Sequence, residues 1–68
     1  MFRENRWYNY KNYTDCTIRY MLRHDIMADD IEVWAIICMY NADLINMFAF
    51  PTEEIAQKNM KMLTGLEV

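Results

Sequence analysis

The chain has 68 residues, of which 54% are hydrophobic, and it carries seven Lys and Arg against ten Asp and Glu, a net charge of −3. This length predicts a single domain, 1–68, with a marginal core, because short chains bury only about 60% of their unfolded surface. The absence of Ser excludes a serine nucleophile, and the presence of one Gly excludes a Gly-rich phosphate loop.

Neither secretion nor membrane insertion is indicated by the sequence. The first residues are charged, unlike a signal peptide, and no segment has the roughly 18 apolar residues that would span a bilayer. We therefore expect a cytoplasmic protein with no membrane contact, whose Cys16 and Cys38 are reduced and buried. The low Gly content and the many Asn, Ile, Met and Tyr residues are typical of AT-rich coding DNA, as in many phages and low-GC bacteria, and are compatible with a viral protein.

Residues 1–13 show no clean period and contain three Asn, which weaken a helix, so we expect an aromatic arm. Its rings are expected to cap an undersized core, with their polar atoms at the wet edge. The alternative is nucleic-acid contact, since basic residues interleave with aromatic ones, but the acidic net charge opposes binding of a polyanion. The candidate contacts would be Arg3, Arg6, Trp7, Tyr8, Tyr10 and Lys11.

Residues 15–24 are predicted to form a helix. Thr14 or Asp15 can cap its start. Apolar residues at helical spacing follow, namely Ile18, Met21 and Leu22. A strand is the rival interpretation, because apolar and polar residues also alternate from 16 to 22.

Residues 29–49 hold the longest apolar run of the chain, 33–40, and are predicted to form a long central helix. Asp29 can act as N-cap, Glu32 stands in the capping-box position, and Pro51 ends the element. A strand again remains the rival, because the run is rich in β-branched residues and its periodicity does not decide.

The predicted central helix lacks the full polar face of a surface helix, since apolar residues fall among its polar ones. Trp34 is expected in the core. The outer face would be enclosed or would meet another chain, and a two-fold pair is the commonest solution. We therefore expect a homodimer whose partner-binding residues are Ile36, Met39 and Tyr40.

Residues 53–64 show the clearest helix signals. Thr52 is a good N-cap, Glu53 and Glu54 suit the first turn, and Gly65 stands where a left-handed residue ends a helix. With the two preceding predictions, this gives an all-α fold: a small three-helix bundle with an aromatic N-terminal arm.

No pattern indicates an enzyme, a cofactor or a metal site. Cys16, His24 and Cys38 lack the close C-x-x-C spacing of structural zinc sites. The sequence argues against a DNA-reading helix-turn-helix, because the second helix would begin with acidic residues and offer no cation to a base or phosphate. The sequence therefore favours a small non-enzymatic protein-interaction module, such as a regulator, an inhibitor or an assembly subunit.

Overall fold

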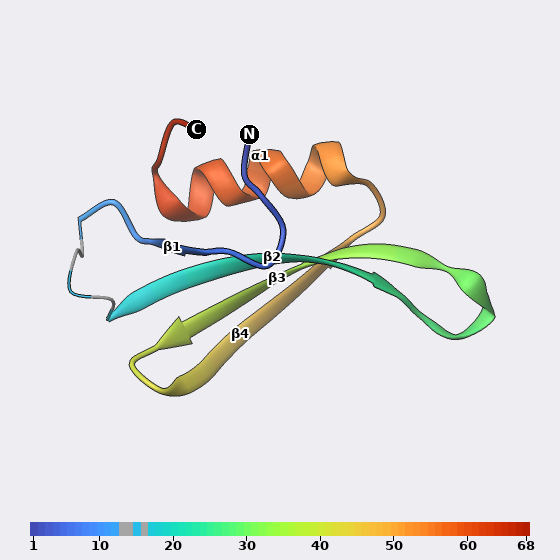
Figure 1. Cartoon of the computed structure of the whole chain (residues 1–68), viewed down its shortest axis with the longest axis horizontal. Helices are drawn as coiled ribbons and strands as arrows, with labels where there is room; N and C mark the ends of the chain where they lie inside the picture. Colours follow the sequence, from blue (N-terminus) through green and yellow to red (C-terminus); the bar gives the residue numbers. More distant parts are fainter. Residues whose placement is uncertain (13–14, 16) are drawn as a thin grey trace.

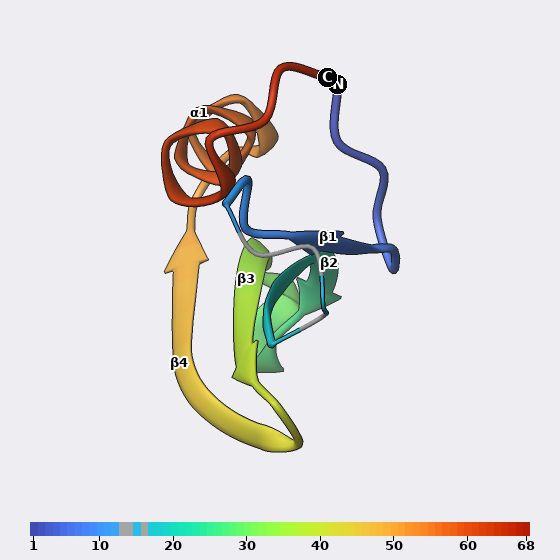
Figure 2. The same cartoon turned by 90° about the vertical axis from the view of Figure 1, so that its left-hand side faces the viewer.

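The computed structural model describes residues 1–12, 15 and 17–68, and within them the chain forms one antiparallel sheet and one α-helix (Figure 1). The strands β1 (Trp7–Asn9), β2 (Ile18–Ile26), β3 (Glu32–Tyr40) and β4 (Asp43–Phe50) lie side by side in chain order. A short 3-10 turn, η1 (Ala28–Asp30), lies between β2 and β3. The helix α1 (Glu53–Thr64) contacts β2, β3 and β4, so the fold has two layers (Figure 2).

The predicted all-α three-helix bundle is wrong. The stretch near 15–24 contributes β2, and the stretch near 29–49 is divided between β3 and β4. The division occurs at Asn41, whose φ of 55° is left-handed and which therefore turns the chain instead of continuing a helix. The β-branched and aromatic residues on both sides of this turn pack well on a pleated surface.

The alternation in β2 is the pattern of a strand with one face against the helix. Tyr20 and Leu22 are buried on the side of α1, and Arg19 and Met21 point to the other side. Leu22 pairs with Ile36 on β3. The rival interpretation of this stretch as a strand is therefore correct from Ile18 onward.

The acidic residues before β3 form a tight turn in place of the expected helix cap. Asp29 and Asp30 have φ values of 68° and 58°. Asp tolerates this left-handed region better than most residues. The N–H of Met27 donates to the carbonyl of Ile31 at 2.8 Å and closes the loop. The resulting β2–β3 hairpin extends past the N-terminal end of α1 (Figure 1).

The predicted helix 53–64 is confirmed at both ends. The Thr52 hydroxyl accepts a hydrogen bond from the N–H of Ile55 at 3.2 Å, as an N-cap should. Gly65 has a φ of 75°, and its N–H donates to the carbonyl of Lys61 at 2.9 Å. Among the described residues, no helix has the length and apolar character needed to cross a bilayer.

The core lies between α1 and the sheet. Leu22, Ile36 and Met60 have no exposed surface. Phe2, from the N-terminal segment, joins them with 5% of its surface exposed. The free Cys38 is also buried there, as expected, whereas Cys16 lies outside the described residues. Each layer thus contributes to one small core, and the N-terminal segment closes it.

Candidate protein interface

One face of the sheet has α1 against it, and the described residues place no element over the other face. We call this second face the open face. Its side chains are those that alternate with the core residues along each strand. On β3 and β4 they are all apolar, namely Val33, Ala35, Ile37, Met39, Leu44, Met47 and Ala49. This set is the apolar half of the open face.

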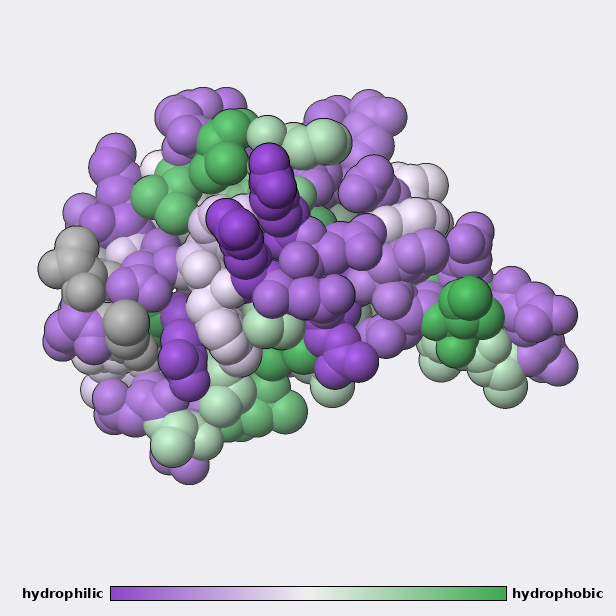
Figure 3. Space-filling model, viewed as in Figure 1, coloured by the Kyte–Doolittle hydropathy of each residue, from purple (hydrophilic) through white to green (hydrophobic). Residues whose placement is uncertain are grey.

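The apolar half is well exposed on β4. Met47 has 59% and Leu44 has 55% of its surface exposed. Between them a β-bulge shifts the register, so that Cys38 pairs with Asn46 but Met39 pairs with Leu44. The extra residue is Ile45, which is 56% exposed and enlarges the apolar surface of this edge strand. Apolar atoms are visible along the lower margin, where β4 lies, and at the far end of the β2–β3 hairpin (Figure 3).

A continuous row of large side chains crosses the open face from one edge of the sheet to the other. Trp7 pairs with Met21, Met21 with Ile37, and Ile37 with Met47. Paired residues on one face of neighbouring antiparallel strands lie about 4.5–5.5 Å apart, so their side chains are direct neighbours. The row joins the apolar half to the remaining strands and gives the open face an apolar centre.

The charges of the open face are confined to β2, where Arg23 and Asp25 form an ion pair and the buried Nε of Arg19 has no hydrogen-bond partner among the described residues. The Arg19 guanidinium lies 4.5 Å from the centre of the Trp7 ring, a cation–π contact. Arg23 Nη2 lies 3.2 Å from Asp25 Oδ1. The open face therefore has a polar margin on one side and an apolar half on the other. This arrangement can bind a protein surface by burying apolar side chains, with polar contacts at the rim.

The structure separates the three predicted partner-binding residues. Met39 lies in the apolar half of the open face. Ile36 is completely buried against α1 and therefore cannot contact a partner. Tyr40 is 45% exposed at the end of β3 and alternates onto the other face. A helix would bring the three together, because its period is 3.6, whereas a strand with period 2 sends residues 36 and 40 to the side opposite 39.

Sequence analysis missed the two residues that join Met39 at the centre of the open face, Ile37 and Met47. The signal was the uninterrupted apolar run 33–40. A strand that is apolar on both faces is typical of a sheet covered on both sides. The predicted helix needed a partner because it had no full polar face, and β3 needs one for the same reason.

The six candidate nucleic-acid contacts do not share one surface environment. Arg3, Arg6 and Lys11 are exposed. Tyr8 is half-buried against the core, its ring meeting the Phe2 ring edge to face at 4.9 Å, and its hydroxyl accepts a hydrogen bond from the N–H of Arg3.

Two aromatic candidates remain in that set. Tyr10 packs against the core like Tyr8, as the core-capping interpretation expects, and Trp7 is the ring that stacks with Arg19. Rings engaged in this way are poor platforms for bases.

The residues considered for zinc are held apart by the sheet. His24 pairs with Trp34, whereas Cys38 lies four residues further along β3, a separation of about 13 Å. The His24 ring stacks on Trp34 with centroids 4.6 Å apart, and its Nε2 lies 3.3 Å from Glu32 Oε1. Within the described part of the chain, no three His, Cys, Asp or Glu residues group as metal ligands would.

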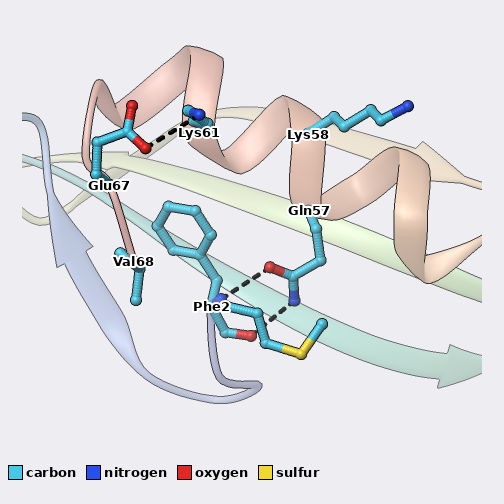
Figure 4. Close-up of a pocket in the computed structure, with 7 residues that line it drawn as sticks. Phe2, Gln57, Lys58, Lys61, Glu67 and Val68 are labelled. Carbon is cyan, nitrogen blue, oxygen red and sulfur yellow. Dashed lines mark hydrogen bonds and ion pairs between the residues drawn. The ribbon is translucent and has the colours of Figure 1, made fainter.

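A pocket of about 230 Å³ lies between the N-terminal segment and α1 (Figure 4). Its polar side chains are already paired within the chain. Gln57 bonds to the backbone of Phe2, and Lys61 Nζ lies 3.0 Å from Glu67 Oε2. Lys58 pairs with a carboxylate of the preceding helical turn at 3.7 Å. The pocket therefore stabilises the N-terminal segment and offers little for a ligand to recognise.

Comparison with known proteins gives no relative. No protein-family model matches the chain, and no curated protein or solved structure matches it either.

Proposed function

We propose that this chain is a small non-enzymatic protein-interaction module that binds another protein chain through the open face of its sheet. The observation that supports the proposal is the apolar half, in which β3 and β4 present no polar or charged side chain on a face that no described element covers. An antiparallel sheet that faces water normally alternates apolar and polar residues. This one is apolar on both sides along β3.

Methionine makes the surface adaptable. Met21, Met39 and Met47 all lie on the open face. Their unbranched side chains repack at little cost, and such residues are common on binding surfaces. Exposed apolar patches of this kind mark protein-protein contacts. The role that fits is a regulator, an inhibitor or an assembly subunit, which acts by occupying a surface of its partner.

The proposal is tested by capture from cells that naturally contain the protein. The tagged parent chain, a Met47→Glu variant and a Met62→Glu variant are compared after washing in high salt. Met62 is the matched control, because it is 75% exposed on α1, away from the open face. A specific protein, another copy of the chain included, should be recovered with the parent and with Met62→Glu. It should be lost with Met47→Glu, because the new charge would be buried unpaired.

Two results would count against the proposal. Equal recovery with both variants would remove the open face from the interaction. Recovery that disappears after nuclease treatment or in high salt would favour nucleic-acid contact by the basic N-terminal segment instead.

A further inference from the structure

We propose that the protein bound at the open face is a second copy of this chain, packed face to face about a two-fold axis lying between the two sheets. This inference rests on the proposed function and names its partner. It predicts a four-layer dimer in which each α1 is on the outside and the two open faces form a shared core.

The distribution of side chains on the open face is self-complementary. The apolar half lies on β3 and β4, and the charged residues Arg19, Arg23 and Asp25 lie on β2. Superposing the two apolar halves places every charge of both copies toward the rim. Protein interfaces have this anatomy, with a dry apolar centre and a polar margin.

Electrostatics permits the chain to bind itself here, although its net charge of −3 makes two copies repel weakly. Five acidic residues lie between positions 24 and 51, the part of the chain that contains β3 and β4, and none of them lies in the apolar half. Arg23 and Asp25 neutralise each other at 3.2 Å, and Arg19 rests on Trp7. No like charges therefore meet at the centre of the contact, the arrangement that would oppose self-association.

The area that a stable pair would cover is a modest share of the surface of the chain. The molecule has extents of 39 × 25 × 15 Å, and the nine-residue strands β2 and β3 are each about 30 Å long. A standard interface buries about 800 Å² on each partner. The whole chain exposes 4773 Å², so about a sixth of it would be covered. Packed sheets lie about 10 Å apart, a gap that Ile, Leu and Met side chains fill.

Face-to-face packing is favoured over pairing of two β4 edges. The hydrogen bond from the N–H of Met27 to the carbonyl of Ile31 fixes which residue pairs of β2 and β3 are hydrogen-bonded. Because hydrogen-bonded and non-bonded pairs alternate in an antiparallel sheet, the backbone N–H and C=O of Met47 point away from β3, toward the free edge of β4. Its N–H already donates to Asn46 Oδ1 at 3.1 Å, so a second copy would have to displace this bond. Edge pairing would also leave Ile37 and Met39 uncovered.

Sedimentation equilibrium over a wide concentration range tests the inference on the full chain. The parent and Met62→Glu should dimerise, and their melting temperatures should rise with concentration. Met47→Glu should weaken the dimer by more than about tenfold, because it introduces like charges into a dry contact. Met47→Gln, which keeps the length and adds no charge, should weaken it less, and circular dichroism should show both variants folded.

Methyl contacts between differently labelled copies distinguish the two arrangements. Face-to-face packing brings the Met39 methyl against open-face methyls of the other copy. In edge pairing, the two β3 strands would be about 14 Å apart, and no such contact could form. Contacts restricted to Leu44, Ile45 and Met47 would therefore overturn the face-to-face arrangement.

A parent chain that stays monomeric at high concentration, with a melt independent of concentration, would overturn the inference entirely. If Met47→Glu still abolished capture of a different protein, the proposed function would stand with another partner. If neither measurement responded to Met47, both would fail.

Discussion

The Gln57 side chain on α1 bonds to both backbone polar groups of Phe2. The N–H of Phe2 donates to Oε1 at 2.8 Å, and Nε2 donates to the Phe2 carbonyl at 2.7 Å (Figure 4). One amide thus satisfies Phe2 as a neighbouring strand would, across 55 positions of sequence. The pairing holds the Phe2 ring in the core and attaches the N-terminal segment to the helix.

Replacing Gln57 with Ala is expected to lower the free energy of unfolding by about 1–3 kcal/mol, because two hydrogen bonds of about 0.5–1.5 kcal/mol each are lost. Urea denaturation measures the change. Lys58→Ala is the matched control, since Lys58 is exposed on the next position of the helix and should change stability by less than about 0.5 kcal/mol. Equal effects of the two substitutions would show that the Phe2 contact contributes nothing to stability.

Leu22 and Ile26 lie on the same strand and test where the core ends. Leu22 has no exposed surface, whereas Ile26 is 67% exposed in the extended hairpin. Leu22→Ala should cost about 2–5 kcal/mol by leaving a cavity. Ile26→Ala should cost less than about 1 kcal/mol, because its side chain is largely in water. Guanidinium unfolding followed by circular dichroism gives both values, and similar losses would mean that the hairpin end is covered.

Tyr20 makes the fold sensitive to alkaline pH. Burial, aided by a hydrogen bond with Cys38, raises the pKa of Tyr20 from 10.0 to about 12. The folded state therefore holds the phenol proton more tightly than the unfolded state. The resulting stabilisation is present in full below pH 10 and is lost as the pH rises from about 10 to 12.

Melting temperatures between pH 9 and 12 test this, with Tyr20→Phe as the control. Phe cannot ionise, so the variant should lose less stability across that interval than the parent does. Parallel pH profiles for parent and variant would show that Tyr20 titrates alike in the folded and unfolded states.

The helix was predictable from sequence because its signals are local. Thr52 and Gly65 each mark a terminus through contacts within one helical turn. The strands were harder to predict, because the run 33–40 suits a buried helix or a buried strand equally well. Which of the two forms depends on pairing with residues that are distant in the sequence. The turn at Asn41 lacks the Gly that commonly marks a hairpin, so the interruption of the run was not evident.

The need for a partner surface was visible in the sequence, but its position was not. An apolar run with no polar side indicated a second contact whether it formed a helix or a strand. The residues involved depend on the period, and the helical period grouped Ile36 with Met39. Only the strand register brings Ile37 and Met47 beside Met39 on one face.

Gly65 ends α1 at a position that L-amino acids occupy only with strain. Its φ is +75°, and a Cβ placed there would lie 3.2 Å from the Cβ of Lys11 and 3.3 Å from its Cδ. Lys11 is itself fixed, because its N–H donates to the carbonyl of Thr64 at 2.7 Å. Gly65→Ala therefore combines a left-handed backbone, which costs about 1–2 kcal/mol, with a crowded contact.

We expect Gly65→Ala to lower the free energy of unfolding by at least about 1 kcal/mol in urea denaturation. A chemically synthesised chain with D-alanine at position 65 is the matched control, because a D-residue adopts positive φ without strain and places its methyl group elsewhere. Its stability should equal or exceed that of the parent, since D-alanine also restricts the unfolded chain. If L-alanine were tolerated as well as D-alanine, the end of α1 would have to relax to a different conformation and release Lys11 from Thr64.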